Sequence, residues 1–138
     1  MKKKITVAIA GLGSRGKDTY AKAAKLFADR MEIVAVADIV PEKVREAAKE
    51  YGIPEDRCFD SAESLLREKR LADVLFICTM DRQHYGHAVP ALKKGYHLLL
   101  EKPVSPVLAE CLEIEETAKK YGRHVVVCHV LRYTPFYQ

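Results

Sequence analysis

The chain has 138 residues, enough for one domain with a single sizeable core. Hydrophobic residues make up 49% of it and charged residues 30%, which is typical of a soluble globular protein and excludes a disordered chain. The net charge of +4 comes from cations scattered among acids, so no nucleic-acid-binding stripe is present. The apolar run after Met1–Lys4 stops at Gly11, well short of the ~20 residues of a membrane span, and we interpret it as a strand rather than a signal peptide.

The cysteines form no C-x-x-C pair and stand at Cys58, Cys78, Cys111 and Cys128. Cys78 and Cys128 lie within apolar runs, where reduced cysteine behaves as a small hydrophobic residue. This usage predicts a reducing, cytoplasmic location.

Strand-like and helix-like segments alternate along the chain, which predicts an α/β fold with a parallel sheet covered on both faces. The predicted strands cover residues 4–10, 32–38, 57–59, 72–78, 96–101 and 124–129. The predicted helices cover residues 14–30, 41–51, 60–69, 83–94 and 105–121, where Ser105 and Pro106 open the last one. Two βαβαβ halves with right-handed crossovers give a Rossmann-type doubly wound sheet, strand order 3-2-1-4-5-6, in three α/β/α layers.

A glycine-rich loop, Gly11-Leu12-Gly13-Ser14-Arg15-Gly16, joins the first strand to the first helix. In this context Gly11 allows a tight turn, Gly13 leaves room for a pyrophosphate near the backbone, and Gly16 lets the helix pack closely on the strand. Free backbone N–H groups and the positive end of the helix dipole would face the phosphates. The alternative is a glycine turn that binds no ligand.

Asp38 ends the second strand, 22 residues after Gly16. A carboxylate there accepts hydrogen bonds from the adenosine ribose and repels a 2′-phosphate, and Ile39 and Val40 offer no guanidinium to hold one, which favours NAD over NADP. A structural alternative is that Asp38 caps the turn before the next helix. Arg15 could pair with the pyrophosphate or with a 2′-phosphate, or simply be a solvated cation.

The segment Thr79-Met80-Asp81-Arg82-Gln83-His84 leaves the fourth strand at the edge that faces the nicotinamide half of the crevice. Asp81 could serve only as a cap for the following helix. His84 and His87 share one helix face, but no third ligand accompanies them, so we predict no metal site and interpret them as packing residues.

Glu101-Lys102-Pro103 ends the fifth strand at the same edge. An ammonium at Lys102 could lie near the nicotinamide and polarise a substrate hydroxyl. The X-Pro bond allows a cis peptide. The alternative is that this tripeptide is only a strand end followed by a turn.

Together these motifs, with Leu131-Arg132-Tyr133-Thr134-Pro135 near the end, resemble the N-terminal domain of the glucose–fructose oxidoreductase and inositol dehydrogenase (Gfo/Idh/MocA) family. The resemblance implies that Lys102 is catalytic. The family's Thr-Pro-Asn-x-x-His motif matches Thr79, Met80, Asp81 and His84, with methionine in place of proline and aspartate in place of asparagine. The cofactor-binding residues that we predict are Gly11, Leu12, Gly13, Ser14, Arg15, Gly16, Asp38, Ile39, Cys78, Thr79, Met80, Asp81, His84, Glu101, Lys102 and Pro103.

The resemblance also implies an NAD-dependent oxidoreductase, with NADP as the alternative cofactor, that transfers hydride between nicotinamide and a sugar, polyol or related hydroxy compound. Residues 1–128 would form the dinucleotide-binding domain, and residues 129–138 would start the connector to a C-terminal α/β substrate domain. We therefore expect a truncated chain that binds cofactor but turns over little, with oligomer contacts mainly in the other domain. Two alternatives are an NAD-dependent glycosidase of the same family and a non-catalytic nucleotide-sensing module.

Overall fold

The computed structural model describes residues 3–137 and contains one parallel sheet in that range. The strands are β1 (Ile5–Ala10), β2 (Met31–Ala37), β3 (Cys58–Phe59), β4 (Val74–Ile77), β5 (His97–Leu100) and β6 (Val125–Val127). Their order, β3-β2-β1-β4-β5-β6, confirms the predicted Rossmann-type topology. The order reverses between β1 and β4, and ligands of such sheets bind outside the carboxyl ends of the strands at this point.

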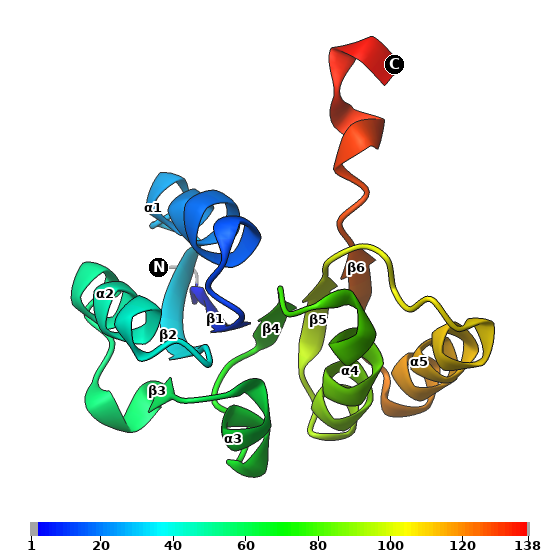
Figure 1. The fold of residues 1–138 in the computed structure, drawn as a ribbon, viewed down its shortest axis with the longest axis horizontal. Coiled ribbons are helices and arrows are strands. Elements are labelled where there is room, and N and C mark those ends of the chain that lie inside the picture. Colours follow the sequence, from blue (N-terminus) through cyan, green and yellow to red (C-terminus); the bar gives the residue numbers. More distant parts are fainter. Residues whose placement is uncertain (1–2, 138) are drawn as a thin grey trace.

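Helices cover both faces of the sheet (Figure 1). The helices α1 (Lys22–Leu26) and α2 (Pro41–Tyr51) lie on one face, and α3 (Ala62–Arg67), α4 (His84–Lys93) and α5 (Leu108–Tyr121) lie on the other. The three predicted layers are therefore present.

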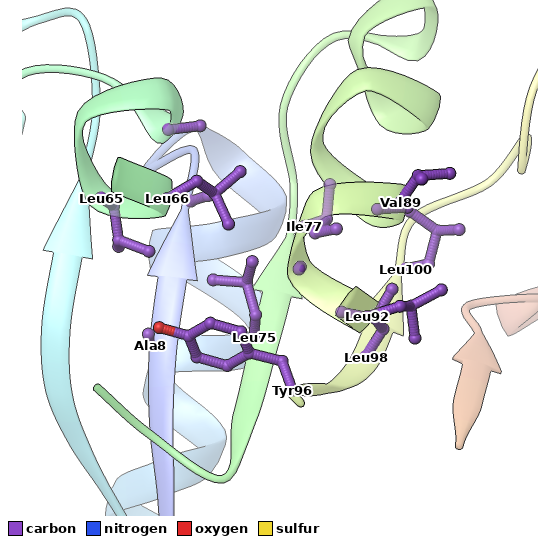
Figure 2. Packing of buried hydrophobic residues seen from close by; sticks show 14 of the residues in the cluster. Ala8, Leu65, Leu66, Leu75, Ile77, Val89, Leu92, Tyr96, Leu98 and Leu100 are labelled. Carbon is purple, nitrogen blue, oxygen red and sulfur yellow. The ribbon is translucent and has the colours of Figure 1, made fainter. Parts of the chain in front are cut away.

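The strand side chains alternate between two apolar cores, one under each helical layer. In β1, Val7 and Ile9 pack toward α1 and α2, whereas Ala8 packs toward α3 and α4. Figure 2 shows the second core, in which side chains of α3 and α4 meet those of β4 and β5 around the fully buried Tyr96. Burial on both faces explains why the strand sequences are nearly continuous apolar runs.

The first helical region is shorter than predicted. It begins with the π-helical segment η1 (Ser14–Ala21), continues as α1 and ends at Leu26, four residues before the predicted end. The chain turns at Phe27, whose carbonyl accepts hydrogen bonds from the N–H groups of Arg30 and Met31. This turn leads directly into β2, so the position of the strand ends the helix earlier than the helical pattern of the sequence predicts.

The start of α5 also differs from the prediction. Ser105 is not the N-cap, because its hydroxyl accepts the N–H of Val107 at 3.0 Å in a local turn, and the helix begins at Leu108. The predicted glycine ends are confirmed, since Gly52 and Gly122 follow α2 and α5 in the left-handed conformation. The remaining short helical turns are η2 (Glu55–Arg57), η3 (Asp81–Gln83), η4 (Val130–Tyr133) and η5 (Pro135–Tyr137).

After β6 the chain leaves the body of the domain as an arm formed by η4 and η5 (Figure 1). Its aromatic side chains are exposed, with Phe136 at 88% and Tyr133 at 79%. The assignment of residues 129–138 as a connector stays a prediction. No helix in the described range is long and apolar enough to cross a membrane.

Candidate functional site

The glycine loop begins where β1 ends at the switch point of the sheet. Gly11 has a φ of 93°, and a Cβ added there would lie 2.5 Å from the carbonyl oxygen of Cys78. A Cβ on Gly16 would lie 1.9 Å from the carbonyl oxygen of Gly11. The fold itself therefore requires both glycines: the predicted tight turn is present, and the close approach at Gly16 is to the loop backbone.

Gly13 differs from its two neighbours in the motif. Its φ of −72° is open to any residue, and an added Cβ would meet no atom within 4 Å. The fold does not need a glycine here, whereas a group approaching the backbone from outside does. No side chain caps the start of η1, which leaves N–H groups of its first turn available to a ligand.

Asp38 holds this loop in place. Its Oδ2 accepts the N–H of Leu12 at 2.6 Å, and its Oδ1 accepts the N–H of Val40 at 2.8 Å. The second bond is the turn expected in the structural alternative, although α2 itself has Val40 as its N-cap and no side-chain cap. Each carboxylate oxygen retains a further lone pair, so Asp38 can also accept a ribose hydroxyl.

A cleft of about 230 Å³ opens between the glycine loop, the end of β2 and the segment after β4. Seven of the predicted site residues line it: Gly11, Gly13, Asp38, Ile39, Cys78, Thr79 and Met80. Leu12 and Ser14 line a neighbouring hollow of about 480 Å³ with Gly13. The other predicted residues lie along the same edge outside the cleft: Arg15, Gly16, Asp81, His84, Glu101, Lys102 and Pro103.

The structure adds residues that the sequence reasoning did not assign to the site. Lys43 lines both the cleft and the neighbouring hollow, which places a cation near Asp38. Its position in the first turn of α2 is the sequence signal for this placement, because helical side chains lean toward the N-terminus. Glu63, Gln83 and His87 also line the cleft.

His84 connects two segments of the edge. It is fully buried, with Nδ1 2.6 Å from the carbonyl oxygen of Pro103 and Nε2 3.2 Å from that of Thr79. His87 contacts other partners, so the two histidines do not converge. Residues 3–137 contain no group of three or more His, Cys, Asp or Glu side chains that could hold a metal. The turn before α4 is capped by Gln83, whose Oε1 accepts the N–H of Met80 at 3.2 Å, rather than by Asp81.

The two charged residues after β5 point in different directions. Glu101 is buried and accepts a hydrogen bond from the Tyr20 hydroxyl, while Arg15 Nε lies 3.9 Å from the same carboxylate oxygen. Burial, with hydrogen bonds to Cys128 and Glu101, raises the pKa of Tyr20 and keeps its phenol protonated. Lys102 is exposed, and its peptide bond to Pro103 is cis. Within the described residues its ammonium has no hydrogen-bond or ion-pair partner.

Comparison with known proteins agrees with this geometry. Residues 5–129 match the model of the Gfo/Idh/MocA family, described as an oxidoreductase family with an NAD-binding Rossmann fold. The chain therefore belongs to this family and contains its NAD-binding domain.

Similar curated proteins include an inositol 2-dehydrogenase/D-chiro-inositol 3-dehydrogenase from Lactiplantibacillus plantarum, 30% identical over 95% of this chain and 37% of that protein. A glycosyl hydrolase family 109 protein from Phocaeicola vulgatus is 30% identical over 96% of this chain and 33% of its own length. The chain thus spans about a third of the length of these relatives.

Among solved structures, an aldose-aldose oxidoreductase from Caulobacter crescentus superposes with a TM-score of 0.83 at 26% identity, covering 97% of this chain and 40% of that one. The WlbA dehydrogenase from Bordetella pertussis, solved with NADH and UDP-GlcNAcA, superposes with a TM-score of 0.81 at 25% identity, covering 92% and 36%.

Proposed function

We propose that this chain binds NAD across the carboxyl ends of β1 and β4 and serves an oxidoreductase that acts on a CH–OH group of a sugar, polyol or related compound. Gly13 carries the proposal. It is a glycine that neither the backbone conformation nor the packing of the protein requires, at the uncapped start of η1. A pyrophosphate approaching the backbone supplies the missing reason.

The residues that line the cleft and the neighbouring hollow have the chemistry to hold the cofactor. The backbone of Gly13, Ser14 and Arg15 would hold the pyrophosphate, and Asp38 would hold the adenosine ribose beside Ile39. Thr79 and Met80 would line the far wall of the cleft, with Asp81 and His84 just beyond it. Bound NAD supplies the ring that takes up hydride from the substrate carbon.

Lys102 would act at the reacting end. Its ammonium is exposed beside the cis peptide, while buried Glu101 behind it accepts the Lys102 N–H at 3.0 Å and fixes the backbone there. An ammonium donates up to three hydrogen bonds, so it can hold a substrate hydroxyl oxygen in place and polarise it. We expect residues 1–138 by themselves to bind the cofactor and to show little turnover.

Calorimetric titration of the chain with NADH, and in parallel with NADPH, tests the binding. Saturable NADH binding with weaker NADPH binding is the expected result, because Asp38 favours a free ribose hydroxyl. Stronger NADPH binding would mean that Lys43 or Arg15 outweighs Asp38. Binding of neither nucleotide would contradict the proposal.

A hydrolase is the second candidate function, because the similar curated proteins include a glycosyl hydrolase family 109 protein. An NAD-dependent glycosidase shows no net change in NADH absorbance during turnover, whereas a dehydrogenase does. A sensor without chemistry would keep its function when Lys102 is replaced.

We also propose a cytoplasmic location and a homo-oligomeric whole protein. All four cysteines are free, which suits a reducing compartment. Analytical ultracentrifugation of the chain, with and without the arm, tests whether its exposed apolar residues take part in association.

A further inference from the structure

Three side chains from separate elements form a hydrogen-bonded row at one wall of the cleft. Thr79 Oγ1 lies 2.9 Å from Nδ1 of His87, and Nε2 of His87 lies 2.8 Å from Oε1 of Glu63. Thr79 follows β4, His87 is in α4 and Glu63 is in α3. The imidazole is buried, with 3% of its residue surface exposed, and all three residues line the cleft.

Donor and acceptor roles in these two hydrogen bonds are defined. An ionised carboxylate only accepts hydrogen bonds, so Nε2 of His87 must carry the proton that faces Glu63. The hydrogen bond from His87 lowers the pKa of Glu63, which keeps it ionised at neutral pH. In the neutral imidazole Nδ1 is then an acceptor, and the Thr79 hydroxyl must donate to it. The remaining lone pairs of Thr79 Oγ1 are left for a ligand.

We propose that Glu63 and His87 are positioning residues that orient the Thr79 hydroxyl, so that it accepts a hydrogen bond from a donor group of the cofactor in the cleft. The inference rests on the proposed NAD binding. The group of the dinucleotide that donates to Thr79 Oγ1 is therefore a hydroxyl or an amide N–H. The phosphates of the cofactor carry no hydrogen to donate, so the row excludes them from this place.

A substitution at Glu63, the exposed residue of the three, tests the proposal by exchanging the donor and acceptor roles at His87. Glu63→Lys replaces an acceptor with a group that only donates, so the His87 proton should move from Nε2 to Nδ1, occupy one lone pair of Thr79 Oγ1 and release the hydroxyl hydrogen, which then competes with the donor of the ligand. Glu63→Gln is the conservative variant, because its amide oxygen can still accept from Nε2. The Glu63 side chain is 59% exposed, so neither change disturbs the core.

Long-range ¹H–¹⁵N spectra report which nitrogen of His87 carries the proton, independently of any ligand. We expect Nε2–H and a bare Nδ1 in the wild type and in Glu63→Gln, and the opposite tautomer in Glu63→Lys. A wild-type imidazole with a proton on Nδ1, alone or together with Nε2, would overturn the inference.

NADH titration measures the consequence for binding. Glu63→Lys should weaken NADH binding roughly tenfold, the equivalent of one lost hydrogen bond, and Glu63→Gln should not. An added positive charge by itself would strengthen the binding of the anionic NADH, so the expected weakening has the opposite sign. The exposed control Glu116→Lys measures this charge effect. In a Thr79→Val background the effect of Glu63→Lys should vanish. Equal weakening in both backgrounds would overturn the inference.

The same titrations separate this inference from the proposed function. The expected tautomer without any NADH binding would count against the function, whereas NADH binding with the wrong tautomer would count against the row. An analogue that carries an acetyl group in place of the carboxamide identifies the donor. Loss of the Glu63→Lys effect with this analogue assigns the carboxamide N–H, and its persistence assigns a ribose hydroxyl.

Discussion

The N–H of Leu12 lies 2.6 Å from Oδ2 of Asp38, so the carboxylate at the end of β2 holds the glycine loop at the end of β1. The other oxygen of the same carboxylate accepts the N–H of Val40 at 2.8 Å. Asp38 therefore has a structural role in addition to the ribose contact that we propose for it.

Asp38→Asn should weaken both roles. The asparagine nitrogen cannot accept a hydrogen bond, so one of the two backbone N–H groups loses its partner, at a cost of about 1 kcal/mol. Urea unfolding measures this loss, and calorimetry with NADH measures the loss of affinity. Unchanged NADH affinity in a destabilised variant would leave Asp38 with the structural role alone.

Lys43→Ala should change the choice between cofactors. Lys43 and Asp38 both line the cleft, and an ammonium in this cleft would pair with the 2′-phosphate of NADPH. We expect roughly a tenfold loss of NADPH affinity, equivalent to one charge-assisted hydrogen bond, with little change for NADH. Lys49→Ala, an exposed lysine of the same helix that does not line the cleft, is the matched control. Equal losses for both nucleotides would refute a selective role.

The fold could be predicted from the sequence further than the site could. Continuous apolar runs such as Val74–Ile77, and glycines such as Gly52 at helix ends, mark the strands and helices through local rules, and the right-handed crossover rule then gives the strand order. The end of α1 and the start of α5 differ from the prediction because turns at Phe27 and Ser105 override the helical pattern.

The site could be predicted only where a motif marks it. Gly13 and Asp38 stand at fixed offsets from strands, and both line the cleft. Lys43, Glu63 and His87 carry no such mark. They reach the site through the packing of α2, α3 and α4 at the edge of the sheet, which depends on contacts between distant parts of the chain.

Tyr20→Phe should destabilise the domain through Glu101. The Tyr20 hydroxyl donates to this buried carboxylate, and its removal leaves a charged acceptor short of a partner. We expect a loss of roughly 1.5 to 3 kcal/mol in the free energy of unfolding, measured with urea at neutral pH. Tyr85→Phe is the matched control, because its hydroxyl donates to Glu113 in a solvent-exposed hydrogen bond, and its removal should lower the free energy of unfolding much less. Equal losses would show that burial of Glu101 does not matter.

Asp73 should contribute to a loss of stability in acid. The hydrogen bond from the backbone N–H of Thr6, and to a smaller extent the one from its hydroxyl, lowers the pKa of Asp73 from its usual 3.8. A carboxyl whose pKa is lower in the folded state stabilises the fold above its unfolded pKa, and this stability is lost as the pH falls through the folded pKa. The difference in melting temperature between wild type and Asp73→Ala should therefore be full at neutral pH and shrink below pH 3.8. A constant difference across this range would show that the ionised form of Asp73 does not stabilise the fold.

NADH titration of Gly13→Ala is the sharpest test of dinucleotide binding by the glycine loop. The added methyl group meets no atom of the protein within 4 Å, so the variant should melt at the wild-type temperature. We expect its NADH affinity to fall at least roughly tenfold, because the methyl group would occupy the path of the pyrophosphate. Gly16→Ala, whose methyl group would collide with the Gly11 carbonyl, should instead lose stability. Wild-type NADH affinity in a stable Gly13→Ala protein would contradict the account.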